Sequence, residues 1–257
     1  MEKGTEQNEA TLRTEVEESS PVEQLLKATQ KELGQAKNEL NFVYPGQGAK
    51  SDVLFNSIGV FTSKGIEATT VQDLLDAANI SRRTFYKYFK NKVDVLESIY
   101  KVAAELLLVR FKAAQNNAQT FQGFIVQCVE VYFDYHTHLG PIVRMMTEEA
   151  RRAGSPLATH RQNVLQQIVD LFEQKFFEYE GVHLDPKVYF SLVWMMESAT
   201  LNIMTSSNFD KKTVEEFKAV MCAISARVVV TDPQQWAELP QMPQKLSDCA
   251  SQMAPTV

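Results

Sequence analysis

Hydrophobic residues recur at helical spacing along most of this chain, and no stretch of useful length alternates between apolar and polar residues as a strand does. Breaks such as QNNAQT, AGSP and EGVHLDP separate the periodic segments. They predict six helices in the larger, C-terminal part of the chain, over residues 91–114, 120–138, 141–153, 157–180, 186–206 and 211–230. The pattern is that of an all-α protein.

Three shorter helices are expected ahead of these six. An apolar stripe over residues 49–64 predicts the first. The second is VQDLLDAA after an N-cap at Thr69 or Thr70, and the third is RRTFYKYF after an N-cap at Ser81. Asn79 can adopt the left-handed conformation of a tight turn between them. The two short helices therefore predict a helix-turn-helix.

Pattern and composition divide the chain into four segments. The first residues are polar and acidic and are expected to be disordered, and an amphipathic helix is expected over residues 20–40. The last residues are rich in proline and glutamine. The expected segments are an N-terminal extension (1–48), the helix-turn-helix domain (49–101), a second helical domain (102–231) and a C-terminal tail (232–257).

The charge of the chain is unevenly distributed. All 257 residues together hold 26 Lys and Arg against 32 Asp and Glu, a net charge of -6. Residues 50–101 hold 8 basic and 6 acidic side chains, and the run NISRRTFYKYFKNK at 79–92 holds five basic residues and no acidic one. A basic patch on an acidic body suits a polyanion that is met in one orientation.

The second short helix of the helix-turn-helix separates its apolar from its basic side chains. Phe85 and Phe89 are four residues apart and are expected to pack inward, which leaves Arg82, Arg83 and the intervening polar residues outward. Arginine can bond guanine in the major groove, and hydroxyl groups can bond phosphate. A solvated basic face is the alternative interpretation of such a run, because charge runs are common.

The segment FNSIGVFTSKGIEATTVQDLLDAANISRRTFYKYFKNKVDVLESI, residues 55–99, resembles the DNA-binding domain of TetR/AcrR-type transcriptional regulators. The motifs F-x-x-K-G, T-T-V-x-D-L and A-N-I-S-R-R-T-F-Y-K-Y-F-K-N-K occur in the order of the family, with Asn79 where the family usually has glycine. The resemblance implies a repressor dimer on a palindromic operator, released by a small molecule in the domain at 102–231. It also implies DNA contacts at Thr70, Ser81, Arg82, Arg83, Thr84, Tyr86, Lys87, Tyr88 and Lys92.

Aromatic residues are frequent in the helices of the second domain. They could line a pocket for a small apolar or aromatic effector, and the alternative is that most of them are ordinary core residues. The candidate pocket residues are Phe124, Cys128, Tyr132, Tyr135, Phe172, Phe176 and Trp194.

The last two helices, 186–206 and 211–230, are expected to pair with those of a second copy. Small residues allow close approach of helices, here Ser198, Ala199, Ala219, Ala223 and Ser225. A four-helix bundle across a homodimer fits this pattern, and a hairpin within one chain is the alternative.

Other function classes find no support in the sequence. Three widely spaced cysteines and four histidines suggest neither a disulfide framework nor a metal site, and no motif predicts an enzyme or a bound cofactor. No apolar run is long enough to span a membrane, so we expect a cytoplasmic protein without membrane contact. The alternative to an effector-controlled repressor is a DNA-binding architectural or partner-recruiting factor without an effector.

Overall fold

The computed structural model describes residues 48–114, 118–205 and 210–229, which form helices and no strand. The expected all-α class is therefore confirmed for this part of the chain. The helices are α3 (Ala49–Lys64), α4 (Val71–Ala78), α5 (Arg82–Tyr88), α6 (Lys92–Ala114), α7 (Phe121–Leu139), α8 (Pro141–Arg151), α9 (Ala158–Glu180), α10 (Pro186–Thr205) and α11 (Lys211–Val228).

The helix ends lie within about two residues of those expected from the sequence, because the breaks carry strong local signals. At the α7–α8 junction, Gly140 has a φ of 52°, and its N–H donates to the carbonyl of His136 at 2.9 Å. Pro141 then begins α8, where its missing N–H is not needed. The amphipathic helix expected at 20–40 and the tail at 232–257 lie outside the described residues.

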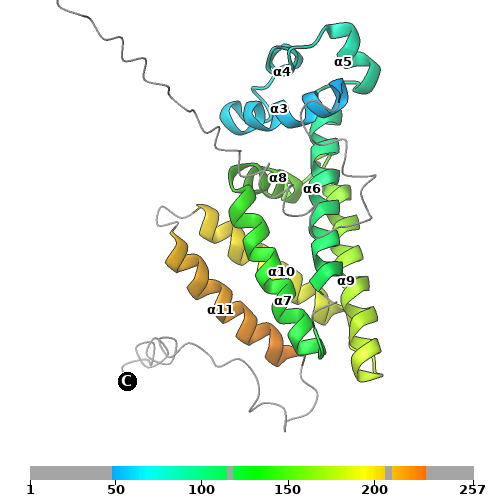
Figure 1. Cartoon of the computed structure of the whole chain (residues 1–257), viewed down its shortest axis with the longest axis vertical. Coiled ribbons are helices and arrows are strands. Elements are labelled where there is room, and N and C mark those ends of the chain that lie inside the picture. Colours follow the sequence, from blue (N-terminus) through cyan, green and yellow to red (C-terminus); the bar gives the residue numbers. More distant parts are fainter. Residues whose placement is uncertain (1–47, 115–117, 206–209, 230–257) are drawn as a thin grey trace, which may run out of the picture.

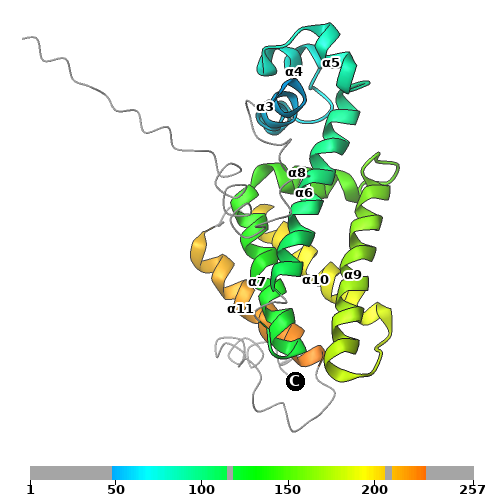
Figure 2. The ribbon, with the colours of Figure 1, turned by 45° about the vertical axis from the view of Figure 1, so that its right-hand side comes forward.

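The molecule is elongated, with a small unit at one end (Figure 1). Helices α3, α4 and α5 form this unit, and α6 runs from it into the larger bundle. Helix α8 lies across the junction and packs against α3, while α7, α9, α10 and α11 complete the bundle (Figure 2). The domain boundary expected at residue 101 stays a prediction, since α6 is continuous through it.

One buried core extends through both parts of the molecule. Val53, Phe61 and Phe85 are fully buried in the small unit, and Phe124 and Phe172 are fully or almost fully buried in the bundle. Helix α11 packs against α7, where buried Ala223 and Ser225 leave room for close approach. These two small residues therefore face their own chain, and only Ser198 and Ala219 of the five expected at a dimer contact are exposed.

Lys92 fastens the loop between α3 and α4 to the start of α6. Its ammonium group donates to the backbone carbonyls of Ile66 at 2.8 Å, Glu67 at 2.8 Å and Thr69 at 2.7 Å. An ammonium has three N–H donors, so all of them are used within the chain. This contact holds the small unit against the helix that leads into the bundle.

We expect the substitution Lys92→Met to lower the free energy of unfolding by about 2 kcal/mol, because it removes three hydrogen bonds from a charged donor. Urea denaturation of the full chain measures the change. Lys90→Met is the matched control, since the Lys90 side chain is exposed. Equal stability of the two variants would contradict a structural role for Lys92.

Candidate nucleic-acid interface and internal cavity

Helix α5 has one buried and one open face. Phe85 is fully buried and Phe89 is 2% exposed, whereas Tyr86 and Tyr88 are 50% and 38% exposed. The ring of Phe85 packs edge-on against Tyr86 at 5.4 Å and contacts Phe89 at 5.7 Å between centroids. The aromatic pair Phe85 and Phe89 therefore anchors the helix and fixes which side chains face outward.

The turn before α5 is fixed by caps at both of its helices. Thr70 forms a capping box with Asp73, in which the threonine hydroxyl accepts from the Asp73 N–H and the Asp73 carboxylate accepts from the Thr70 N–H. Asn79 has the left-handed conformation, with φ 50° and ψ 48°, as expected. Ser81 caps α5 by accepting from the Thr84 N–H at 3.1 Å. The relative orientation of α4 and α5 is thus set by local hydrogen bonds.

Asp73 also binds a lysine of α3. Its carboxylate accepts from the Lys64 ammonium at 2.6 Å. This bond, together with those from Thr70, lowers the pKa of Asp73 to about 2. The negative charge nearest the start of α4 is therefore neutralised by a neighbour and does not oppose an anionic ligand.

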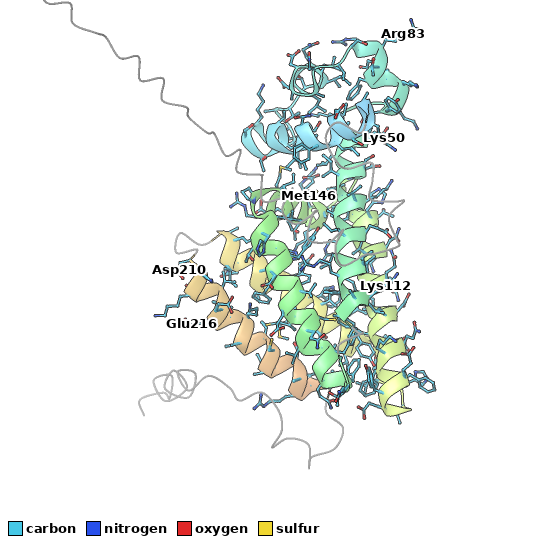
Figure 3. The ribbon with its side chains drawn as sticks, in the orientation of Figure 1. Lys50, Arg83, Lys112, Met146, Asp210 and Glu216 are labelled. Carbon is cyan, nitrogen blue, oxygen red and sulfur yellow. The ribbon has the colours of Figure 1, made fainter. Side chains whose placement is uncertain are left out.

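The outward side chains of α5 are basic and aromatic. Arg82 donates to the Gln72 side chain at 3.0 Å, which ties α5 to α4. Arg83 and Lys87 form no ion pair within the described ranges of the chain, and the Lys87 ammonium lies 5.2 Å from the centre of the Tyr88 ring. Figure 3 shows Arg83 at the far end of the small unit, pointing away from the bundle.

The structure places all nine candidate contact residues on this end of the molecule. Thr70 and Ser81 are exposed but act as helix caps, and Thr84 is half-buried beside Ser81. Lys92 differs, because its three donors are used by backbone carbonyls. Its ammonium positions the loop before α4, and a phosphate contact at Lys92 stays a prediction.

A cavity of about 60 Å³ lies inside the bundle among α6, α7, α8, α9 and α10. Two of the candidate pocket residues, Tyr132 and Tyr135, line it, and Met146 lines it from α8 (Figure 3). The other candidates lie elsewhere: Phe124, Cys128, Phe172 and Phe176 are buried in packed core, and Trp194 is 50% exposed on the bundle surface.

The sequence reasoning missed the polar residues of this cavity. Arg161 of α9 and Glu197 of α10 line it and form an ion pair, and Tyr100 of α6 lies beside them. The signal for Glu197 was present, since it is the single charged residue in the apolar segment VYFSLVWMMESATLNIM. A carboxylate in the middle of such a helix is buried with a partner or marks a site.

His136 lines the same cavity and is 4% exposed. Its Nδ1 lies 2.7 Å from the carbonyl oxygen of Tyr132, and its ring stacks on Tyr132 at 3.9 Å. Burial lowers the pKa of His136 to about 4, while the bond to the carbonyl acts in the opposite direction. The folded protein therefore holds this histidine neutral.

We expect stability to fall as pH is lowered from 6.5 towards 4. In this window the unfolded chain binds a proton at His136 that the folded chain does not. The stability that neutral His136 provides is therefore fully present above pH 6.5 and is lost as the pH falls towards 4. The expected loss at pH 5 relative to pH 7 is about 2 kcal/mol.

The measurement is the free energy of unfolding of the wild type and of His136→Gln at both pH values. The exposed His138, two residues away, supplies the control His138→Gln. The pH dependence should shrink in the His136 variant only. Identical pH dependence in all three proteins would contradict the assignment.

Among the residues that the structure describes, no group of three or more His, Cys, Asp or Glu side chains is arranged to hold a metal ion. No helix among them is both long and apolar enough to cross a membrane.

Residues 57–99 match the model of the family described as bacterial regulatory proteins, tetR family. The HTH-type transcriptional repressor KstR2 of Mycobacterium tuberculosis is 24% identical over 110 residues, which cover 41% of this chain and 53% of KstR2. The chain thus spans about half the length of the curated relatives that it matches.

Solved structures show the same fold over more of the chain. The fatty acid degradation regulator FadR of Bacillus halodurans has a TM-score of 0.59 at 17% identity and covers 70% of this chain and 97% of its own. A putative TetR-family regulator of Syntrophomonas wolfei has a TM-score of 0.57 at 13% identity and covers 72% and 98%. At these identities the likeness concerns the fold alone.

Proposed function

We propose that this chain, a TetR-type regulator by its DNA-binding segment and its fold, is a dimeric repressor that binds a palindromic operator and leaves it when a small molecule enters the bundle. The observation that carries the proposal is that α5 has one buried and one exposed face. Phe85 and Phe89 are buried, while the exposed face carries Arg83, Tyr86 and Lys87. Such a repressor acts in the cytoplasm, where the chromosome is accessible.

In the proposed complex, α5 enters the major groove. Arg83 and Tyr86 meet base edges, and Lys87 and Tyr88 meet backbone phosphates, because cations and hydroxyls are suitable donors for these groups. The caps Thr70 and Ser81 bring helix N-termini towards the phosphates, where N–H groups favour anions. Arg82 and Thr84 stand at the edge of this contact surface.

The exposed face of α10 and α11 is the proposed dimer contact. On α11, Phe217, Val220, Ile224 and Val228 follow one another at intervals of three or four residues, and Phe217 and Val228 are 42% and 49% exposed. On the neighbouring α10, Trp194 is 50% exposed and contacts the ring of Phe190 at 5.7 Å. The partner on this face is a second copy of the chain, since two α5 helices about 34 Å apart can read a palindrome.

Coupling between cavity and DNA passes through two helices. Helix α8 lines the cavity with Met146 and packs against α3 of the small unit, and α6 lines it with Tyr100 and begins beside α5. The cavity of about 60 Å³ holds only a few waters, so a ligand must push helices apart to enter. The displacement would change the spacing of the two α5 helices in the dimer.

The alternative of an architectural factor without an effector predicts a filled bundle. The cavity and its polar residues favour the effector-controlled repressor. The N-terminal extension that motivates the alternative lies outside the described residues.

We expect Arg83→Ala to weaken binding to the operator by about 10- to 100-fold, as loss of one bidentate contact to guanine does. Fluorescence anisotropy with duplex DNA from upstream of the gene, over a salt series, measures the affinity. Lys112→Ala removes an exposed cation from the distant part of α6 and is the control (Figure 3). An equal loss in both variants would indicate non-specific attraction and would overturn the assignment of α5.

We expect Phe217→Glu to convert the dimer to monomers, because it places a charge within the apolar stripe of α11. Sedimentation velocity measures the mass of the particle. Phe177→Glu is the matched control, since Phe177 is 48% exposed on α9 and stacks on His183 away from the stripe. A dimer in both variants would rule out this face as the contact.

A further inference from the structure

Glu197 is shared by two arginines from two other helices. Arg161 of α9 donates to it through Nε at 2.8 Å and through Nη2 at 2.5 Å. Arg151 is the last residue of α8, and its Nη1 lies 3.8 Å from Oε2 of Glu197. Glu197 itself is 7% exposed, so the cluster joins three helices around one buried carboxylate.

Two arginines share the single carboxylate of this cluster. Arg161 and Glu197 are the charged side chains of the cavity wall, while the 41% exposed Arg151 approaches the same carboxylate from outside that wall. The other polar side chains of the wall are neutral. Burial raises the pKa of the Tyr100 and Tyr132 hydroxyls, and burial lowers the pKa of His136. Arg161 is therefore the cation that an anionic ligand in the cavity would meet, and its counter-ion Glu197 is shared with Arg151.

Hydrogen-bond donors for such an anion are present. Arg161 uses Nε and Nη2 on Glu197, and its Nη1 donates to no acceptor in the described part of the chain. The Tyr100 hydroxyl likewise has no partner there, and its pKa responds to the charges of both Glu197 and Arg161, which places it beside them. Both side chains line the cavity.

The rest of the cavity wall is apolar. Its side chains come from four different helices and carry no strong hydrogen-bonding group; they are Leu107, Val143, Met146, Ile168 and Val193. A ligand that fits both regions has an apolar body and a single polar end. The polar end meets Arg161, and the body displaces apolar side chains as the cavity widens.

We propose that the cavity binds an apolar molecule ending in a carboxylate, which takes the free donors of Arg161 and Tyr100 beside Glu197. This inference rests on the proposed function, since it names the ligand class of the site through which the repressor is released. A cationic ligand would be repelled by Arg161 and would compete for a carboxylate that two arginines already hold. A neutral alcohol would give the free Arg161 donor no charged partner.

Calorimetric titration of the full chain tests the charge preference directly. The probes are hexanoate, decanoate and 4-phenylbutyrate, each with its matched primary alcohol, and decylamine as the cation, all below their aggregation concentrations. At least one carboxylate should bind at least about tenfold more tightly than its alcohol, because a hydrogen bond to a charged group adds that much affinity. If no carboxylate binds more tightly than its alcohol, the proposal is overturned.

Two variants separate recognition from folding. Glu197→Gln keeps the shape of the side chain and removes the competing charge, so the carboxylate should bind about tenfold more tightly than to the wild type, a gain that misfolding cannot produce. Arg161→Met combined with Glu197→Met removes both charges together and should abolish the preference for carboxylate over alcohol. Arg144→Met, on α8 but outside the cavity wall, is the control and should retain the preference. An unchanged affinity in Glu197→Gln would overturn the proposal.

Operator binding is measured in parallel, without ligand and with it. A wild type that binds the operator but shows no carboxylate preference overturns only the ligand class. A wild type that prefers carboxylates but binds no DNA, or stays on the DNA when saturated, overturns the proposed repressor function and leaves the ligand class standing. The two inferences therefore fail separately.

Discussion

The presentation of α5 depends on the burial of two aromatic rings. A helix of seven residues is not stable in water by itself, because its few hydrogen bonds do not offset the cost of nucleation. Phe85 and Phe89 supply the packing that holds it, and the Ser81 cap fixes its first turn. Every outward side chain of α5 owes its direction to these contacts.

The position of the small unit relative to the bundle depends on hydrogen bonds of Lys92. Lys92 binds three carbonyls of the loop before α4 from the first turn of α6, so the orientation of the small unit follows that of α6. Helix α6 also carries Tyr100 into the cavity, and α8 touches both the cavity and α3. The cavity is therefore connected to the small unit through two helices, α6 and α8, as the proposed coupling requires.

Local signals in the sequence were sufficient for the helices and for the division of α5. Thr70, Asn79 and Ser81 act through hydrogen bonds and backbone angles within a few residues, and the spacing of Phe85 and Phe89 determines which face is buried. Long-range partners could not be predicted in this way. Lys92 bonds carbonyls 23 to 26 residues away, and nothing in its neighbouring residues predicts those bonds.

The residues of the cavity also could not be predicted from local sequence signals. Aromatic residues suggested a pocket, but in the structure most of them fill the core, and Trp194 is exposed. Arg161 and Glu197 are 36 residues apart, and only the packing of α9 on α10 brings them together. A buried ion pair costs desolvation and adds little net stability, which is consistent with the ligand-binding role proposed for this pair.

The central claim is that two copies of α5 read one DNA site together. The most direct test selects bound sequences from a random duplex pool with the full-length protein. Hydroxyl-radical footprinting then maps the contacts on the enriched sequences. We expect an inverted repeat whose half-site centres are about 10 base pairs, or a multiple of that, apart. Its enrichment should disappear with Arg83→Ala. Selected sequences without a repeat, or the same repeat selected by the variant, would contradict it.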